Sequence, residues 1–330
     1  MSSTFELYLE KPGMIKIREG IQRHALAAND VRIKVSYGGI CGSDLRVYKG
    51  TISYAQYPLR PGHEVIGTVV EAGENVQLEV GTKAVVYPNT YCGECEFCAG
   101  GKTNICVHKK PLGVSADGVF AQEIVLDAKY IIPVPEELPD ERAILIEPFA
   151  VTVHALKKAN ITKGTTVAVI GCGTEGLLSI ALALYQGANV TVIDINPVKL
   201  ALAKKLGNVT TRLPAEVKDE VFDVVIEAAG VKDAIQQAMA VVKPGGVMVP
   251  LGITMDTVHL SPVHIVRNEI SILGSIIYTV DDFLEAITYL KDPSLFVEPI
   301  ISKTWACDRY QEAFDDALSG NYAKIIVKFA

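Results

Sequence analysis

Residues 166–176 read Thr-Val-Ala-Val-Ile-Gly-Cys-Gly-Thr-Glu-Gly, an apolar run that leads directly into three closely spaced glycines. The apolar run predicts a short buried strand, and residues 177–186 predict an apolar helix. A second apolar run follows at residues 190–194 and ends in Asp194. Glycines between a strand and a helix, with an acid at the end of the next strand, are the fingerprint of a dinucleotide-binding site.

The glycine-rich loop has a chemical purpose that its composition explains. Its glycines allow a tight turn and a close approach of the backbone to a pyrophosphate, which would lie at the helix N-terminus. Asp194 would accept hydrogen bonds from the adenosine ribose and repel a 2′-phosphate, which favours NAD over NADP. The candidate cofactor-binding residues are therefore Gly171, Gly173, Glu175, Gly176 and Asp194.

Strand and helix signals continue to alternate after this loop. The next apolar segments lie at residues 222–228, 234–242, 246–252 and 270–277. Together they predict an α/β fold with a doubly wound parallel sheet of about six strands. After residue 281 we expect helices at 283–290 and 309–318 with a loop between them, and a last strand at 324–329.

The first part of the chain has a different pattern. Val31, Ile33 and Val35 alternate with polar residues, as in a half-buried strand. Residues 64–72, 83–87 and 120–126 are further β-rich runs, and residues 14–90 contain no long segment of helical period. A compact, mostly β domain is predicted, followed by a helical segment at 139–159 that Pro148 should kink.

Cys41 and His63 each lie among glycines, in Ile40-Cys-Gly-Ser-Asp44 and Pro61-Gly-His-Glu64. Thiolate and imidazole are ligands that zinc prefers, and a catalytic zinc keeps one coordination position open. Glu147 stands in an otherwise apolar run, where a carboxylate is costly unless it is paired or binds a metal. Glu147 is thus either a third ligand or a side chain that reaches solvent at the kink.

Four of the seven cysteines lie close together in the chain, at Cys92, Cys95, Cys98 and Cys106. Two-residue gaps allow four sulfurs to surround one ion, which predicts a structural zinc site. A Cys-x-x-Cys redox pair is the alternative, but such a motif opens a helix after a strand, whereas glycines mark this segment as a loop.

The composition excludes several classes of function. A net charge of −7 and 49% hydrophobic residues are typical of a soluble globular protein and argue against a nucleic-acid or anionic-membrane partner. No run is long enough to span a membrane, and the N-terminus does not resemble a secretion signal. Clustered cysteines in an odd total suggest metal binding in a reducing compartment, so we expect a cytoplasmic protein.

Taken together, these motifs resemble those of the zinc-containing medium-chain alcohol/polyol dehydrogenases, essentially from end to end. The resemblance rests on Gly39–Asp44, Gly62–Glu64 with Gly67, the four cysteines, Glu147-Pro148, and the glycine-rich loop with Asp194. It implies a β-rich, GroES-like catalytic domain at about 1–150, an NAD-binding Rossmann domain at about 151–285, and a segment at 286–330 that returns to the catalytic domain.

The resemblance also implies roles for individual residues. Cys41, His63 and Glu147 match the ligands of the catalytic zinc, and Glu64 matches a neighbouring carboxylate that can enter its coordination sphere. Ser43 matches the hydroxyl that passes the substrate proton out, and Asp44 is expected to orient the histidine ligand or the loop. Two zinc ions per chain, one of them held by the four cysteines, and NAD are the implied cofactors. A homodimer or homotetramer is the expected assembly.

Hydride transfer from a small-molecule alcohol to NAD is the implied reaction. Two departures from the family pattern bear on it. Arg46 replaces a histidine that often ends the proton relay, and because it stays protonated it cannot act as a base. Ile276-Ile277-Tyr278 replaces a Phe-Arg-Tyr run that contacts polyols in sorbitol-type enzymes. The relay is then expected to end at a cofactor hydroxyl and water.

Arg46, with Lys49 nearby, also suggests a substrate. A guanidinium can bind a carboxylate with paired hydrogen bonds. We therefore expect a sugar acid as the substrate, ahead of a neutral polyol, and threonine as the third choice. Arg46 as a surface charge or a cofactor-phosphate ligand is the alternative. A zinc-free quinone reductase or a non-catalytic relative is disfavoured because Cys41, His63 and the four cysteines are all present.

Overall fold

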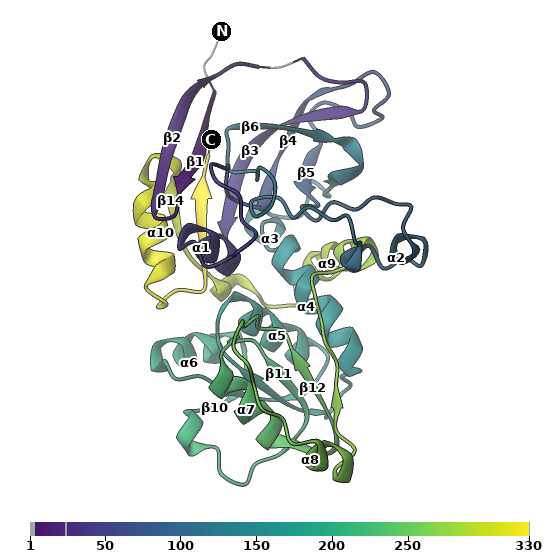
Figure 1. Ribbon diagram of the computed structural model, residues 1–330, viewed down its shortest axis with the longest axis vertical. Helices are drawn as coiled ribbons and strands as arrows, with labels where there is room; N and C mark the ends of the chain where they lie inside the picture. Colours follow the sequence, from purple (N-terminus) through teal and green to yellow (C-terminus); the bar gives the residue numbers. More distant parts are fainter. Residues whose placement is uncertain (1–3, 24, 330) are drawn as a thin grey trace. The chain divides into compact units, whose positions relative to one another are not determined.

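A computed structural model describes residues 4–23 and 25–329, which form two compact units. The first unit contains the chain up to Glu147, Ile301–Gly320 and the residues from Lys324 on; the second contains Pro148–Ile300 and Asn321–Ala323. The boundary expected near 285 falls inside helix α9 (Val280–Lys291), which belongs wholly to the second unit. Figure 1 shows the order of the elements along the chain.

The second unit is built on a six-stranded parallel sheet in the order β10-β9-β8-β11-β12-β13. Its strands are β8 (Thr166–Ile170), β9 (Asn189–Ile193), β10 (Thr210–Arg212), β11 (Phe222–Glu227), β12 (Val242–Pro250) and β13 (Ser271–Ile272). This order confirms the predicted doubly wound sheet. The strand order reverses between β8 and β11, and ligands of such sheets bind outside the carboxyl ends of the strands at that point.

Helices precede, connect or follow these strands in the chain, and the inner strands are apolar on both faces. The helices are α4 (Ile146–Ala159), α5 (Thr174–Tyr185), α6 (Pro197–Ala203), α7 (Lys232–Val241), α8 (Pro262–Arg267) and α9. Val167, Val169 and Val225 are completely buried. A parallel sheet covered on both faces requires such uninterrupted apolar strands, which is why the sequence pattern identified them.

Two strands of this sheet differ from the prediction. The expected strand at 270–277 is reduced to the two residues of β13, and Ile277 has a φ of +54°, which is incompatible with extended backbone. The three residues of β10, Thr-Thr-Arg, are partly exposed and carry no apolar run that would have identified them. Both lie at the edges of the sheet, where burial does not impose a pattern.

The first unit contains a seven-stranded sheet in the order β14-β15-β3-β4-β5-β7, with β6 also paired to β3. Its strands are β3 (Asp30–Ile40), β4 (Glu64–Ala72), β5 (Lys83–Val86), β6 (Glu123–Asp127), β7 (Ile131–Pro133), β14 (Ile301–Ala306) and β15 (Lys324–Lys328). A separate hairpin is formed by β1 (Thr4–Lys11) and β2 (Met14–Ile21). Ile325 of β15 is in register with Ile40 of β3, so the end of the chain joins the strand that precedes Cys41.

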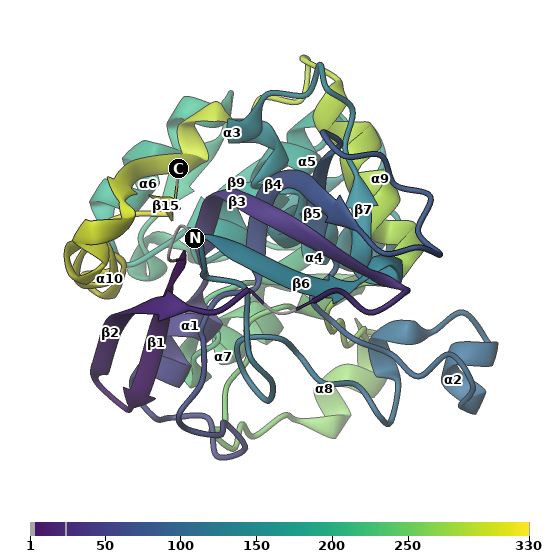
Figure 2. The same cartoon turned by 90° about the horizontal axis from the view of Figure 1, so that it is seen from above.

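The first unit also contains four short helices: α1 (Gly42–Tyr48), α2 (Glu96–Ala99), α3 (Asp140–Ala143) and α10 (Tyr310–Leu318). Helix α1 was not predicted, because seven residues are too few to show a helical period. The segment with α2 projects from the strands of its own unit in both views (Figures 1 and 2). Strand β14 lies where a loop was expected, since its partly exposed residues Ile-Ser-Lys-Thr-Trp-Ala form no apolar run.

The kink expected at Pro148 is absent, and that prediction was wrong. Helix α4 begins at Ile146 and continues past Pro148 to Ala159. Pro148 lies in the first turn, where backbone N–H groups have no acceptor within the helix, so the proline removes no hydrogen bond. The interruption comes earlier, between the end of α3 at Ala143 and Ile146. Across the described residues, none of the helices combines the length and the apolar character needed to cross a membrane.

Candidate functional site

The junction between β3 and α1 positions the first candidate metal ligand. Cys41 follows β3 directly and is the N-cap of α1, with extended backbone (φ −101°, ψ 159°). His63 and Glu64 lie where the neighbouring strand β4 begins, and Glu64 pairs with Gly39 of β3. A Cβ atom at Gly39 would overlap the Glu64 carboxylate. Glycine at this position therefore leaves room for the Glu64 side chain beside β3.

Asp44 ties the two segments together from a buried position, with 1% of its surface exposed. Its Oδ2 accepts a hydrogen bond from the Cys41 backbone N–H at 2.9 Å, and its Oδ1 accepts one from the Gly62 N–H at 3.1 Å. Oδ1 also lies 3.4 Å from Nδ1 of His63. Nε2 is the ring nitrogen of His63 that Asp44 does not face, and the orienting role expected for Asp44 stays a prediction.

Ligand atoms of Cys41, His63 and Glu64 all lie within 4.8 Å of one another. Sulfur, imidazole nitrogen and carboxylate oxygen are the donor types that zinc accepts, so this group fits a zinc ion. Glu147 is buried in the first turn of α4 and is not part of this group; its negative charge is one of the causes that raise the pKa of Glu64. The Ser43 hydroxyl lies 3.5 Å from Nε2 of His63.

The electrostatics of His63 reflect its acidic neighbours. Burial by itself lowers the pKa of His63, but the negative charges of Asp44 and Cys41 outweigh it and hold this pKa well above its usual value. The neighbours of His63 therefore favour a positive charge at this position. A divalent cation is the natural complement of such a donor set.

Lys324 is an unpredicted member of this site. Its ammonium group contacts both carboxylate oxygens of Glu64, at 2.7 and 2.6 Å, and lies 3.3 Å from the Ile40 carbonyl oxygen. Both charged side chains are completely buried. Burial raises the pKa of Glu64 to about 7, and the Lys324 charge opposes that rise. A lysine at the start of the apolar run Ile-Ile-Val was the sequence signal that could have revealed it.

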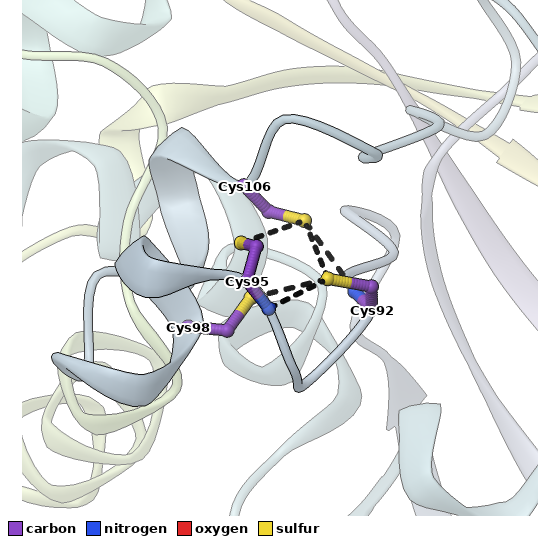
Figure 3. Close-up of side chains that lie close together, drawn as sticks. All are labelled: Cys92, Cys95, Cys98 and Cys106. Atoms are coloured by element: carbon purple, nitrogen blue, oxygen red, sulfur yellow. Dashed lines mark hydrogen bonds between the residues drawn. The ribbon is translucent and has the colours of Figure 1, made fainter.

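The four clustered cysteines converge on a single point (Figure 3). The Sγ atom of Cys92 lies 3.9 Å from that of Cys98 and 3.6 Å from that of Cys106, and the Sγ atoms of Cys95 and Cys106 are 3.9 Å apart. Four sulfurs bound tetrahedrally at about 2.3 Å from one zinc ion would be about 3.8 Å apart. The spacing fits a closed zinc site and leaves every thiol unpaired by a disulfide.

Backbone N–H groups donate hydrogen bonds to these sulfurs. The N–H groups of Cys95 and His108 point at the sulfurs of Cys92 and Cys106, each at 3.4 Å. Hydrogen bonds from the backbone at Cys98 and Val107 lower the pKa of the Cys95 thiol to about 6. Thiolate is the form that binds metal, so the loop favours the reactive state of at least this ligand.

In the second unit the glycine-rich loop links β8 to α5. Gly171 has a φ of +98°, and a Cβ atom there would lie 2.7 Å from the Ala229 nitrogen. A Cβ at Gly176 would overlap the Gly171 carbonyl oxygen, whereas Gly173 faces open space. The first and third glycines thus permit the tight turn and the close packing of helix on strand that a dinucleotide loop needs.

Asp194 follows β9 and is tied to this loop. Its Oδ2 accepts a hydrogen bond from the Cys172 N–H at 2.6 Å, and its Oδ1 accepts one from the Asn196 N–H at 2.8 Å. Glu175, in the first turn of α5, accepts a hydrogen bond from the Thr152 hydroxyl at 3.4 Å. The structure therefore brings all five predicted cofactor-binding residues to the carboxyl ends of β8 and β9.

The two departures from the family pattern, at Arg46 and at Ile276-Ile277-Tyr278, lie in different units. Arg46 is half-buried on α1, and its carbonyl oxygen accepts hydrogen bonds from the backbone and the hydroxyl of Thr51. Tyr278 is completely buried and packs on Phe283, with ring centroids 5.4 Å apart. Arg46 belongs to the unit of the candidate metal site, and the other run belongs to the unit of the glycine-rich loop.

Family models match both parts of the chain. Residues 27–136 match the alcohol dehydrogenase GroES-like domain, and residues 176–292 match the zinc-binding dehydrogenase family. The chain is 32% identical to D-arabinitol dehydrogenase 1 of Uromyces fabae, over 98% of this chain and 96% of that protein. It is also 32% identical to sorbitol dehydrogenase of Bacillus subtilis (strain 168), over 88% of this chain and 87% of that protein.

Solved structures share the complete fold. A zinc-binding dehydrogenase from Sinorhizobium meliloti 1021 bound to NADP superposes with a TM-score of 0.93 at 28% identity, covering 99% of this chain and 100% of that one. A short chain alcohol dehydrogenase from E. coli CFT073 with NADH gives the same four values. L-idonate 5-dehydrogenase from Escherichia coli has a TM-score of 0.91 at 25% identity and covers 99% of this chain and 98% of that one.

Proposed function

Since this chain belongs to the zinc-containing medium-chain alcohol/polyol dehydrogenase family, we propose that it oxidises a secondary hydroxyl group of a sugar acid or polyol with hydride transfer to NAD. The observation that carries this proposal is the convergence of Cys41, His63 and Glu64 in one unit. The glycine-rich loop with Asp194 in the other unit supports the cofactor assignment. The first unit would then be the catalytic zinc domain and the second the nucleotide domain.

Two zinc ions per chain are part of the proposal, one at Cys41 and His63 and one at the four cysteines. A bound zinc supplies a Lewis acid that lowers the pKa of a hydroxyl group, and NAD supplies the hydride acceptor. Cys41 and His63 would hold the catalytic ion, with Glu147 as the third protein ligand. Because Lys324 engages both oxygens of Glu64, Glu64 would act as a charged neighbour of the ion that can also approach it.

The remaining residues position the substrate and move its proton. Asp44 holds the Cys41 and Gly62 backbones and faces Nδ1 of His63, so the donor atoms keep one geometry. Ser43 Oγ, 3.5 Å from Nε2 of His63, would receive the substrate proton and pass it on. Arg46 cannot accept that proton, and the relay would continue to a cofactor hydroxyl and water.

Substrate choice is expected to depend on Arg46. An NAD-reduction screen over aldonates, neutral polyols, threonine and simple alcohols should give the highest kcat/KM with an aldonate, because a guanidinium grips a carboxylate with paired hydrogen bonds. Arg46→Ala should then raise the KM for that acid about tenfold or more, the loss of a charge-assisted contact. Lys49→Ala, at an exposed position just after α1, is the matched control and should change KM little.

The relatives favour different answers to this screen. D-arabinitol and sorbitol dehydrogenases are named for neutral polyols, and L-idonate 5-dehydrogenase for a sugar acid. The sugar-acid assignment fails if neutral polyols are the better substrates and Arg46→Ala leaves their KM unchanged. Faster oxidation of threonine than of any polyol or acid would instead assign the third substrate class.

Cofactor preference is expected to follow Asp194. Its carboxylate stands beside the glycine-rich loop and would repel the 2′-phosphate of NADP, so wild type should prefer NAD. Asp194→Ala should narrow the ratio of kcat/KM for NAD over NADP by about tenfold, equivalent to about 1.4 kcal/mol. Asn196→Ala, which leaves that charge in place, should not narrow it. A wild-type preference for NADP would contradict the assignment.

A homo-oligomer is also proposed. Among the described strands β13 lies at an edge of its sheet, and the segment before it carries exposed apolar side chains at Ile253, Met255, Val263 and Val266. Exposed apolar side chains in a segment that leads into an edge strand are typical of an interface between protein chains. Sedimentation velocity of the purified chain measures its state, and a monomer at micromolar concentration would refute the proposal.

A further inference from the structure

A buried carboxyl group ends β11 in the middle of the parallel sheet. Glu227 is the last residue of that strand, in register with Ile170 of β8 on one side and Pro250 of β12 on the other. None of its surface is exposed. An acid in such a place is costly unless hydrogen bonds compensate its loss of water.

Glu227 forms four hydrogen bonds to two different loops. Its Oε1 accepts from the N–H groups of Ala229 and Gly230, at 2.9 and 2.8 Å. Its main-chain carbonyl oxygen accepts from the N–H groups of Leu251 and Gly252, at 2.7 and 2.8 Å. One residue thereby holds both the loop after β11 and the loop after β12, which lie at the carboxyl ends of adjacent strands.

The loop after β11 packs closely against both the glycine-rich loop and the loop after β12, with no space for a side chain at either contact. A Cβ atom at Gly171 would lie 2.7 Å from the Ala229 nitrogen, and one at Gly252 would lie 2.5 Å from the Gly230 Cα. The Ala228 N–H donates to the Ile170 carbonyl oxygen at 2.8 Å. A shift of the loop after β11 would therefore be transmitted to the turn that begins the dinucleotide site.

The second carboxyl oxygen of Glu227 accounts for much of the cost of burying this side chain. Oε2 is buried without a hydrogen-bond partner, whereas a carboxylate needs partners for both oxygens. Burial raises the pKa of Glu227 against the opposing effect of the Gly230 and Ala229 N–H groups. In either protonation state Oε1 is the acceptor for the Ala229 and Gly230 N–H groups, a role that the carbonyl oxygen of a glutamine amide can also fill.

We propose that Glu227 is a positioning residue for the dinucleotide: through Oε1 and its main-chain carbonyl it fixes the two loops that border the glycine-rich turn. The residue does not touch the cofactor itself, since it is fully buried. Its effect reaches the cofactor through the backbone at Ala229 and Gly171. The inference rests on the proposed function insofar as that function assigns NAD to this edge of the sheet.

The test measures NADH binding by fluorescence titration, together with the melting temperature. Glu227→Ala removes both bonds to Oε1 and should raise the Kd for NADH about tenfold or more, as expected for two hydrogen bonds in a rigid site. Glu227→Gln keeps the carbonyl acceptor and should stay within about threefold of wild type. Gly252→Ala, whose Cβ atom would press on Gly230 and would lie 2.9 Å from Oε2 of Glu227, should weaken NADH binding in the same way without removing the acid.

Asp223 offers a matched control on the same strand. It lies at the opposite end of β11, where its Oδ2 accepts from the N–H and hydroxyl groups of Thr166 at 3.0 and 2.6 Å. Asp223→Ala should therefore lower the melting temperature but leave the Kd for NADH within about twofold of wild type. A purely structural role for Glu227 would make the two alanine variants behave alike.

The outcomes separate this inference from the proposed function. If the wild-type protein binds no NADH, the cofactor assignment itself is wrong. If wild type binds NADH and both Glu227→Ala and Gly252→Ala bind it equally well, only the positioning role is refuted. Equal loss of binding in Glu227→Gln and Glu227→Ala would overturn the acceptor role of Oε1. If Glu227→Ala does not fold, Gly252→Ala and Glu227→Gln still decide the question.

Discussion

Replacing Cys41 with serine is expected to reduce turnover by about 1,000-fold, because a zinc ion supplies several kcal/mol of transition-state stabilisation that depends on its ligands. The same substitution should leave the melting temperature close to that of wild type. Cys41 is half-exposed at the N-cap of α1, and the fold around it is held by Asp44 through backbone groups rather than through the Cys41 thiol.

Cys95→Ser is expected to lower the stability of the protein, in contrast to Cys41→Ser, which should lower its turnover. The segment from Cys92 to Cys106 contains only the four residues of α2 and a three-residue 3₁₀ turn, so little besides a bound ion would hold it together. Losing the ion should cost at least roughly 4 kcal/mol and lower the melting temperature on the order of 10 °C. Calorimetry, zinc content and single-turnover assays on the same preparations measure both effects.

Cys172→Ser provides a matched control for these two substitutions. Cys172 is completely buried in the second unit and is not part of either cysteine-containing ligand group. Its replacement should leave the zinc content at about two ions per chain. The assignment of the two sites fails if Cys95→Ser melts like wild type while Cys41→Ser retains near-normal turnover.

Local spacing explains which parts of this molecule could be predicted. The four cysteines lie within one short segment, and the glycine-rich loop lies between two adjacent elements, so in both cases the chain itself brings the residues together. Asp194 was found because it directly follows β9, the next strand in sequence after the glycine-rich loop and α5. The inner strands β8, β9 and β11 were found because burial on both faces requires apolar runs.

Other features depend on contacts that no local pattern encodes. Glu64 and Lys324 are 260 residues apart in the chain and meet only because β15 pairs with β3. Glu227 ends a strand whose apolar residues gave no hint of a hydrogen-bonded acid. Helix α1 was missed because its seven residues are too few to show a helical period, and the Asp44 side chain that accepts from the Cys41 backbone N–H at its start gives no apolar pattern.

The buried ion pair behind the metal site leads to the second large expected effect. Lys324→Met should destabilise the first unit by about 3–5 kcal/mol, because it leaves the Glu64 carboxylate buried without its cation. Lys324 and Glu64 have side-chain exposures of only 1% and 0%, so water cannot replace the lost partner. The single tryptophan, Trp305, lies on β14 of the same unit, and its emission during urea unfolding reports on that unit.

Two further variants distinguish loss of the ion pair from loss of packing. Lys328→Met changes an exposed lysine of the same strand and should alter the free energy of unfolding by less than about 0.5 kcal/mol. Glu64→Gln combined with Lys324→Met removes both charges and should recover most of the loss, since buried pairs replaced together are often nearly neutral. If Lys324→Met alone costs less than about 1 kcal/mol, the pair does not carry this stability. If the double variant is as unstable as the single one, the contribution of Lys324 comes from its packing in β15 rather than from its charge.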